Sequence, residues 1–224
     1  EEINRMVTDR LSDLLFVTEK SGYKNLLHEG TDKDKIFFVG NTMIDSLVAT
    51  ISKIKKSYFF KENFYSNDYI TLTLHRPSNV DDMDTLKTIL ERVMIWTKNT
   101  KVVWPIHPRI DKENLKFLSE NFILIEPIGY FEFLNLVYNC KYVITDSGGI
   151  QEESTYLNIP CITLRENTER PVTVEEGTNI LLKRSDFSIE NLSDIIVERK
   201  NIPQFWDGKA SHRILKYFKN FISK

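Results

Sequence analysis

Short apolar runs alternate with longer amphipathic stretches over most of the chain. The apolar runs are rich in β-branched and aromatic residues, as buried strands are, and the stretches between them repeat apolar residues at helical spacing. Strands that alternate with helices in this way predict an α/β fold with a doubly wound parallel sheet, covered by helices on both faces. The expected strands are 69–74, 102–106, 122–125, 142–145, 161–164 and 180–182, and the expected helices are 83–96, 112–119, 130–138, 150–157 and 189–198.

The first part of the chain shows the same alternation on a smaller scale. Its pattern predicts helices at 1–11, 19–28 and 43–54 and strands at 14–18 and 36–39. Residues 55–68 are charged and aromatic without a clear period, which favours a linker or a peripheral element. A last amphipathic helix is predicted at 208–221.

A strand, a glycine turn and a helix follow one another in TDSGGIQEESTYL, residues 145–157. Two adjacent glycines let a ligand approach the backbone closely, and the first N–H groups of the helix favour an anion there. Phosphate is the natural candidate. Many α/β folds use such a turn only to reverse the chain, so the turn alone leaves both interpretations open.

Polar residues surround this turn. A carboxylate at Glu152 or Glu153 can accept hydrogen bonds from sugar hydroxyls, or it can simply complement the helix dipole. The next strand is followed by the polar loop RENTERP, residues 165–171. Ligands collect at the carboxyl ends of strands in an open parallel sheet, so both loops are expected at one crevice.

Histidines end two of the predicted strands. His75, with Arg76 beside it, follows the strand at 69–74, and His107 follows the strand at 102–106. A histidine or arginine at such a strand end can neutralise a diphosphate. A histidine there can equally be hydrogen-bonded to a neighbouring loop and have no ligand.

Three motifs together resemble the signature of the non-hydrolysing UDP-N-acetylglucosamine 2-epimerase family: DSGGIQEE at 146–153, RENTERP at 165–171 and EEGTN at 175–179. The resemblance implies a glycosyltransferase-B-like pair of Rossmann-like domains with the active site between them. It divides this chain into a remnant of the first domain, a UDP-binding second domain, and a helix that packs back toward the first, at 1–40, 41–207 and 208–224.

The chain begins with Glu, and its first residues have the pattern of the middle of a structure rather than of its start. The sequence is therefore interpreted as a fragment, which is not expected to be catalytically active on its own. The resemblance implies catalytic roles for Glu1 and His75. On spacing alone, Phe133 would pack in the core. The remaining implied contacts are uracil at Ile128 and Phe133, phosphates at Ser147, Gly148 and Gly149, ribose at Glu153, and nucleotide at Arg170, with His75, Arg76 and His107 also contacting the substrate.

Some bacterial members of that family bind a second, regulatory UDP-N-acetylglucosamine near the position of His107. They carry arginine and glutamate where this chain has Pro77 and Ser78. A regulatory site is therefore not predicted here.

The reaction implied by the resemblance is inversion at C2 of UDP-N-acetylglucosamine, giving UDP-N-acetylmannosamine for polysaccharide biosynthesis. UDP would be eliminated to leave 2-acetamidoglucal and then added back, with no cofactor and no metal. Two alternatives stay open. One is a hydrolysing epimerase or a related glycosyltransferase, which releases UDP irreversibly, and the other is a nucleotide-sugar-binding module without activity.

The composition limits the possible partners and setting of the protein but indicates no particular chemistry. The 224 residues carry a formal net charge of -2, which gives no electrostatic argument for nucleic acid or a membrane surface as partner. Cys140 and Cys161 lie in or beside apolar strands and are interpreted as buried thiols of a reducing, cytoplasmic setting. The family resemblance also implies a homodimer for the full-length protein and a monomer for this fragment.

Overall fold

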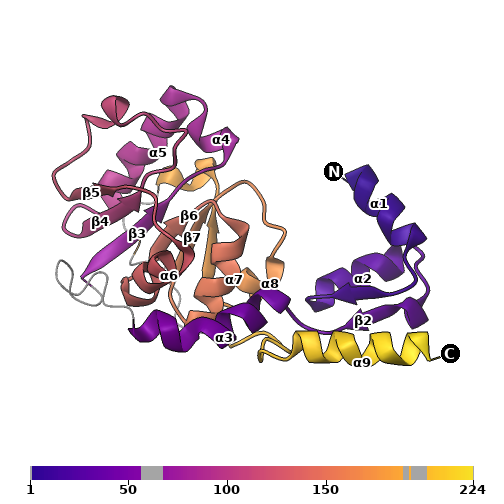
Figure 1. Ribbon diagram of the computed structural model, residues 1–224. Coiled ribbons are helices and arrows are strands. Elements are labelled where there is room, and N and C mark those ends of the chain that lie inside the picture. The colour runs from indigo at the N-terminus through magenta and orange to yellow at the C-terminus, as the bar shows by residue number, and fades with distance from the viewer. Residues whose placement is uncertain (1, 57–67, 189–191, 193–200, 224) are drawn as a thin grey trace. The chain divides into compact units, whose positions relative to one another are not determined.

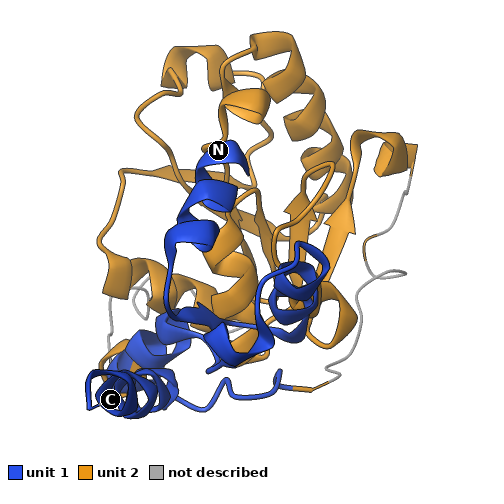
Figure 2. Ribbon diagram, turned by 90° about the vertical axis from the view of Figure 1, so that its right-hand side faces the viewer, with its two compact units in different colours: residues 1–50, 202–224 blue, residues 51–201 orange. Residues whose placement is uncertain are grey.

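The computed structural model describes residues 2–56, 68–188, 192 and 201–223. The chain divides into two compact units, Glu1–Thr50 with Ile202–Lys224, and Ile51–Asn201. Figure 2 shows the first unit in blue and the second in orange. The first unit is therefore built from segments at both ends of the sequence.

The first unit contains a small parallel β-α-β arrangement. Leu15 pairs with Ile36 across its two strands, and these residues form a compact core with Val17 and Leu26. Its elements are α1 (Glu2–Leu11), β1 (Leu15–Val17), α2 (Lys20–His28), a 3-10 turn (Lys33–Lys35), β2 (Ile36–Phe38), the first part of α3 (Thr42–Lys56), and α9 (Ala210–Ile222).

Helix α9 packs next to strand β2 within this unit. The Tyr217 and Phe37 rings lie 4.4 Å apart between centroids, and Arg213 Nη1 donates to the Val39 carbonyl at 3.1 Å. Aromatic contact and a charge-assisted hydrogen bond thus hold the last helix of the chain to its first strands.

The second unit is built on a six-stranded sheet in which every strand pair is parallel, in the order β5-β4-β3-β6-β7-β8. The chain winds outward from β3 in one direction and from β6 in the other, so the strand order reverses between these two strands. In such sheets the crevice at the carboxyl ends of the reversal strands is where ligands bind. The strands are β3 (Tyr69–Thr73), β4 (Lys101–Pro105), β5 (Phe122–Ile125), β6 (Val143–Thr145), β7 (Cys161–Leu164) and β8 (Asn179–Leu182).

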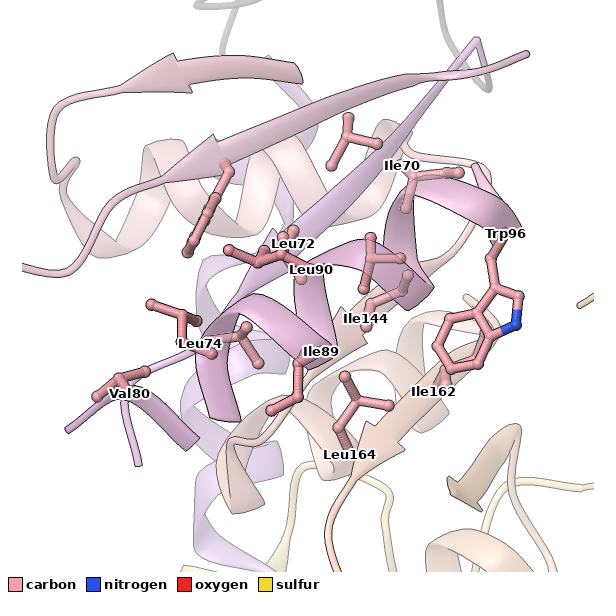
Figure 3. Packing of buried hydrophobic residues seen from close by; sticks show 14 of the residues in the cluster. Ile70, Leu72, Leu74, Val80, Ile89, Leu90, Trp96, Ile144, Ile162 and Leu164 are labelled. Carbon is pink, nitrogen blue, oxygen red and sulfur yellow. The ribbon is translucent and has the colours of Figure 1, made fainter. Parts of the chain in front are cut away.

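Helices cover both faces of this sheet (Figure 1). Successive strand residues point to opposite faces, so Ile70 and Leu72 pack in one hydrophobic cluster with Leu90 of α5 (Met83–Trp96), as Figure 3 shows. Tyr69 lies in the other cluster, with Leu136 of α6 (Tyr130–Asn139) and with α7 (Gly148–Leu157). Burial on both faces explains why the strands are apolar throughout rather than alternating.

The structure confirms the predicted doubly wound parallel sheet and most of its elements, and it corrects one. Residues 112–119 were expected to form a helix, but only Lys112–Leu115 form a 3-10 turn, continued by a hydrogen bond from Leu118 N–H to the Leu115 carbonyl. Only Leu115 and Leu118 have helical spacing here, and Phe117 between them packs against the same cluster, so no apolar helical face repeats. Two short helices, α4 (Pro77–Val80) and α8 (Pro171–Glu175), and a 3-10 turn at Arg184–Ser188 were not predicted, and the predicted helix at 189–198 lies almost entirely outside the described residues.

Candidate functional site

A buried carboxylate joins the two strands at the point where the strand order reverses. Asp146 follows β6 and has no exposed surface, while His75 and Arg76 follow β3. The backbone N–H groups of His75 and Arg76 donate to the Asp146 carboxylate at 3.1 and 3.0 Å. The loops after β3 and β6 are thereby fixed to each other at the carboxyl edge of the sheet.

Two side chains complete the shell around Asp146. His75 Nδ1 lies 3.0 Å from Oδ1, and Asn79 Nδ2 donates to Oδ2 at 3.1 Å and to the carbonyl of Leu164, the last residue of β7, at 3.2 Å. Burial alone would raise the pKa of Asp146, but the hydrogen bonds from His75, Arg76 and Asn79 outweigh burial and lower it. Sequence reasoning gave Asp146 no role beyond the turn. Its position directly after an apolar strand is the signal that was available.

The two histidines predicted at strand ends lie side by side. The His75 and His107 ring centroids are 6.2 Å apart, and His107 Nδ1 accepts a hydrogen bond from the Arg109 backbone N–H at 3.3 Å. Arg76 Nε donates to the Asp146 carbonyl at 3.1 Å, which keeps the guanidinium at the same edge. Basic and imidazole groups therefore gather at the ends of β3 and β4.

Helix α7 begins at this edge with the amide end of its dipole. Ser147 is the N-cap residue, its side chain makes no capping hydrogen bond, and its own N–H donates to Thr145 Oγ1 at 3.0 Å. A Cβ added at Gly148 would meet nothing within 4 Å. The start of α7 thus has open space at Gly148, together with the partial positive charge that suits an anion.

The two glutamates that follow the glycines have different partners. Glu152 forms an ion pair with Arg170 of the loop after β7, with 2.8 Å between Oε1 and Nε. Glu153 Oε1 accepts a hydrogen bond from the Tyr130 hydroxyl at 2.7 Å. Burial raises the pKa of Glu153 to about 7; the Tyr130 hydrogen bond opposes the rise and the charge of Glu152 adds to it. Glu153 can therefore change its protonation state near neutral pH.

Gln151 links the three sequence motifs. Its Oε1 accepts from the Thr168 hydroxyl at 2.6 Å and from Asn179 Nδ2 at 3.1 Å, while its Nε2 donates to the Ser147 carbonyl at 3.2 Å. The loop that contains Thr168 and the start of β8 at Asn179 are thereby tied to the first turn of α7. This role was missed from the sequence because it depends on residues 17 and 28 positions further along the chain.

The side chains expected beside a base lie on the same side of the sheet as α7. Ile128 and Phe133 are partly buried and pack against the cluster that contains Ile150, the third residue of α7. In the sequence they lie on either side of Tyr130, the partner of Glu153. Glu1, the predicted catalytic carboxylate, lies outside the described residues.

A pocket of about 330 Å³ opens beside this edge. Its lining includes Arg76 after β3, Asn79 of α4, Arg165 after β7, and Arg184 after β8. Among the residues that the structure describes, no group of three or more His, Cys, Asp or Glu side chains is placed to hold a metal ion. No helix in the described part of the chain is long and apolar enough to cross a membrane.

The fold and the site define an α/β domain that gathers histidine, arginine and a helix amino end at one edge of its sheet, an arrangement that suits an anion. The family model for UDP-N-acetylglucosamine 2-epimerase matches residues 1–219. The chain belongs to this family.

Curated relatives and solved structures agree with this assignment. UDP-N-acetylglucosamine 2-epimerase of Methanocaldococcus jannaschii is 39% identical over 96% of this chain and 63% of the relative. A crystal structure of the M. jannaschii enzyme in complex with UDP-GlcNAc and UDP superimposes with a TM-score of 0.79, over 97% of this chain and 64% of that one. The enzyme of Neisseria meningitidis bound to UDP-GlcNAc is 30% identical and gives a TM-score of 0.81 over 98% and 65%. These likenesses confirm the glycosyltransferase-B-like fold. The chain spans about 63% of the length of the curated relatives from M. jannaschii and Methanococcus maripaludis.

Proposed function

We propose that the protein acts as a non-hydrolysing UDP-N-acetylglucosamine 2-epimerase and that its second unit binds the UDP part of the substrate. The observation that supports this most directly is the gathering of groups at the reversal of strand order. His75 is held there through Asp146, the open amino end of α7 begins there, and Arg170 is held to α7 through Glu152. All three favour a diphosphate.

The contacts proposed for UDP follow the chemistry of each side chain. The start of α7, at Ser147, Gly148 and Gly149, takes the phosphates together with His75, Arg76 and Arg170. Glu153 accepts hydrogen bonds from the ribose hydroxyls, which needs its ionised form. Ile128 and Phe133 border the uracil, with His107 beside His75.

The proposed reaction is an elimination followed by an addition. The C1–O bond breaks as UDP leaves, C2 loses its proton, and 2-acetamidoglucal remains; UDP then re-adds as C2 takes a proton on the opposite face. Cleavage places negative charge on the leaving diphosphate, which His75, Arg170 and the α7 amino end stabilise. Carboxylates move the proton, and Glu1 is the one proposed within this sequence.

Some parts of the proposal concern the whole protein. Residues 1–40 are assigned to a remnant of the first Rossmann-like domain, 41–207 to the UDP-binding domain, and 208–224 to a helix that packs back toward the first domain. The last assignment is supported by the compact unit that joins 1–50 with 202–224. UDP-GlcNAc and UDP are the proposed ligands, and a homodimer the proposed assembly. A cytoplasmic setting is proposed because Cys140 and Cys161 are free and buried, as thiols are in a reducing compartment.

Binding and turnover are tested separately because the chain spans only part of its relatives' length. Calorimetric titration of residues 1–224 with UDP should give saturable binding, and no binding would overturn the proposed site. A form of this protein extended to the full length of its relatives should form UDP-N-acetylmannosamine when it is incubated with UDP-GlcNAc. Proton NMR follows the product. Free N-acetylmannosamine with UDP would instead indicate the hydrolysing reaction, and UDP binding without any product would indicate a binding module.

A further inference from the structure

The Asp146 carboxylate contacts both the backbone and the ring of His75. Oδ1 lies 3.1 Å from the His75 backbone nitrogen and 3.0 Å from ring Nδ1. Oδ2 accepts from the backbone N–H of Arg76 and from Asn79 Nδ2, so Asp146 is itself held in place. Rotation of the His75 ring would break its contact with the carboxylate, which these other hydrogen bonds hold in place.

These contacts determine which ring nitrogen carries the hydrogen. An ionised carboxylate only accepts hydrogen bonds, so Nδ1 must be the protonated nitrogen of a neutral His75 ring. The other nitrogen, Nε2, is on the far side of the ring from Asp146. The His75 side chain is 41% exposed while that of Asp146 is 0% exposed, so a ligand can reach the ring but not the carboxylate.

We propose that Asp146 is a positioning residue that holds His75 as the Nδ1–H tautomer and directs Nε2 toward the diphosphate. A second proton on the ring then has only Nε2 to occupy, where it can be donated to a phosphate oxygen. The neutral ring presents a lone pair at the same place. The inference rests on the proposed function only for the identity of the ligand, since the tautomer is a property of the free protein.

The tautomer is read directly from nitrogen-15 NMR of the histidine side chains near pH 9, where imidazoles are neutral. The chain has four histidines, and His75→Gln identifies the His75 signals by their loss. In the wild type we expect a pyrrole-like Nδ1 and a pyridine-like Nε2. In Asp146→Asn the side-chain amide can donate to Nδ1, which should move the hydrogen to Nε2.

A wild-type His75 with the hydrogen on Nε2, or a tautomer that Asp146→Asn leaves unchanged, would overturn the proposal. The wild-type spectrum alone decides the matter if the variant does not fold. Failure of the wild type to bind UDP would contradict the proposed function and leave the tautomer result standing, so the two outcomes are distinguishable.

Calorimetric titration with UDP separates positioning from mere loss of structure. Asp146→Asn and His75→Gln should each weaken UDP binding by about tenfold or more. The double variant should bind little more weakly than either, because both substitutions remove the same Asp146–His75 interaction. Asn135→Ala is the control: it removes a buried hydrogen bond, from Nδ2 to the Ile54 carbonyl at 2.7 Å, elsewhere in the same unit. An equal loss of UDP affinity in Asn135→Ala, or fully additive effects in the double variant, would assign Asp146 a structural role only.

Discussion

Arg170 and Glu152 form an ion pair, with 2.8 Å between Nε and Oε1, that ties the loop after β7 to helix α7. The Glu152 side chain is 3% exposed and that of Arg170 is 37% exposed, so the arginine is partly open to solvent while its partner is buried. A second contact, from Arg170 Nη1 to the Glu169 carbonyl at 3.1 Å, limits its rotation further. The pair therefore presents a cation at a defined place beside the amino end of α7.

The first prediction concerns this cation. Arg170→Ala should weaken UDP binding by about 1.5 to 3 kcal/mol, because a charge-assisted hydrogen bond to phosphate is lost. Calorimetric titration with UDP measures the change. Uridine, which has no phosphate, should be affected much less.

Two further variants, Glu152→Gln and Lys98→Ala, are the comparisons for Arg170→Ala. Glu152→Gln leaves the Arg170 cation in place but removes the charged partner that holds it, so UDP binding should weaken by less than in Arg170→Ala. Lys98 is exposed and precedes β4 at the opposite edge of the sheet, so Lys98→Ala removes the same charge without touching the site. An unchanged titration for Arg170→Ala, or an equal effect of Lys98→Ala, would remove Arg170 from the binding site.

The second prediction concerns the stability contributed by Glu153. Its pKa is about 7 in the folded protein against an ordinary value of 4.5, so the folded state keeps a proton that the unfolded state has released. Stability from this group is complete below pH 4.5 and is lost as the pH rises through 7. Glu153→Gln should therefore be more stable than the wild type at pH 8, by up to about 3 kcal/mol, and nearly equal to it at pH 4.5.

Urea denaturation at the two pH values tests this sign. UDP binding should respond in the opposite direction, because the ribose hydroxyls need the ionised carboxylate as acceptor. The ratio of wild-type affinity to that of Glu153→Gln should rise from pH 6 to pH 8. Taking the ratio removes the effect of the ionisation of UDP itself, which is the same for both proteins. A variant that is less stable at pH 8, or one whose pH profile for UDP parallels the wild type, would contradict the assignment.

The parallel sheet was predictable because each strand is short, apolar and bounded by a helix with a distinct period, and burial on both faces produces that pattern. The glycine turn after β6 was predictable for a similar reason: a strand, two glycines and a helix start are local signals. Residues 112–119 were predicted wrongly because a single apolar pair at helical spacing, Leu115 and Leu118, suggests a helix without a repeating face to bury.

The connections within the site were not predictable in the same way. Asp146 and Asn79 are 67 residues apart, and Arg170 reaches Glu152 from a different loop. No periodicity relates such pairs; only the sheet topology brings their strand ends to one edge. A single sequence could indicate that polar residues follow apolar strands, but not which of them share a hydrogen bond.

The third prediction concerns the free energy that Asp146 contributes. The hydrogen bonds around it lower its pKa below the ordinary 3.8, so its stabilisation is present above pH 3.8 and is lost as the pH falls through the lower folded value. Asp146→Asn should lower the free energy of unfolding by about 2 to 4 kcal/mol at pH 7, because buried donors lose a charged acceptor. Denaturation of both proteins at pH 7 and near pH 3 should show the difference shrinking in acid; a difference that grows in acid would contradict the lowered pKa.

The last prediction uses the open space at the start of α7. Gly148→Ala adds a methyl group that meets no atom within 4 Å, so the variant should fold with a stability close to that of the wild type. The methyl group would take up open space at the first residue of α7, beside which we place the phosphates. UDP affinity should therefore fall by about tenfold, equivalent to about 1.4 kcal/mol, while the thermal midpoint stays nearly constant.

Gly22→Ala is the matched control for Gly148→Ala. A Cβ at Gly22 lies at ordinary contact distance from Val17, 3.6 Å, within helix α2 of the other unit. This variant should fold and bind UDP as the wild type does, with a small gain in stability from replacing a helical glycine. If Gly148→Ala also bound UDP with unchanged affinity, the phosphates would have to lie away from the start of α7, and the site would have to be placed elsewhere on the carboxyl edge of the sheet.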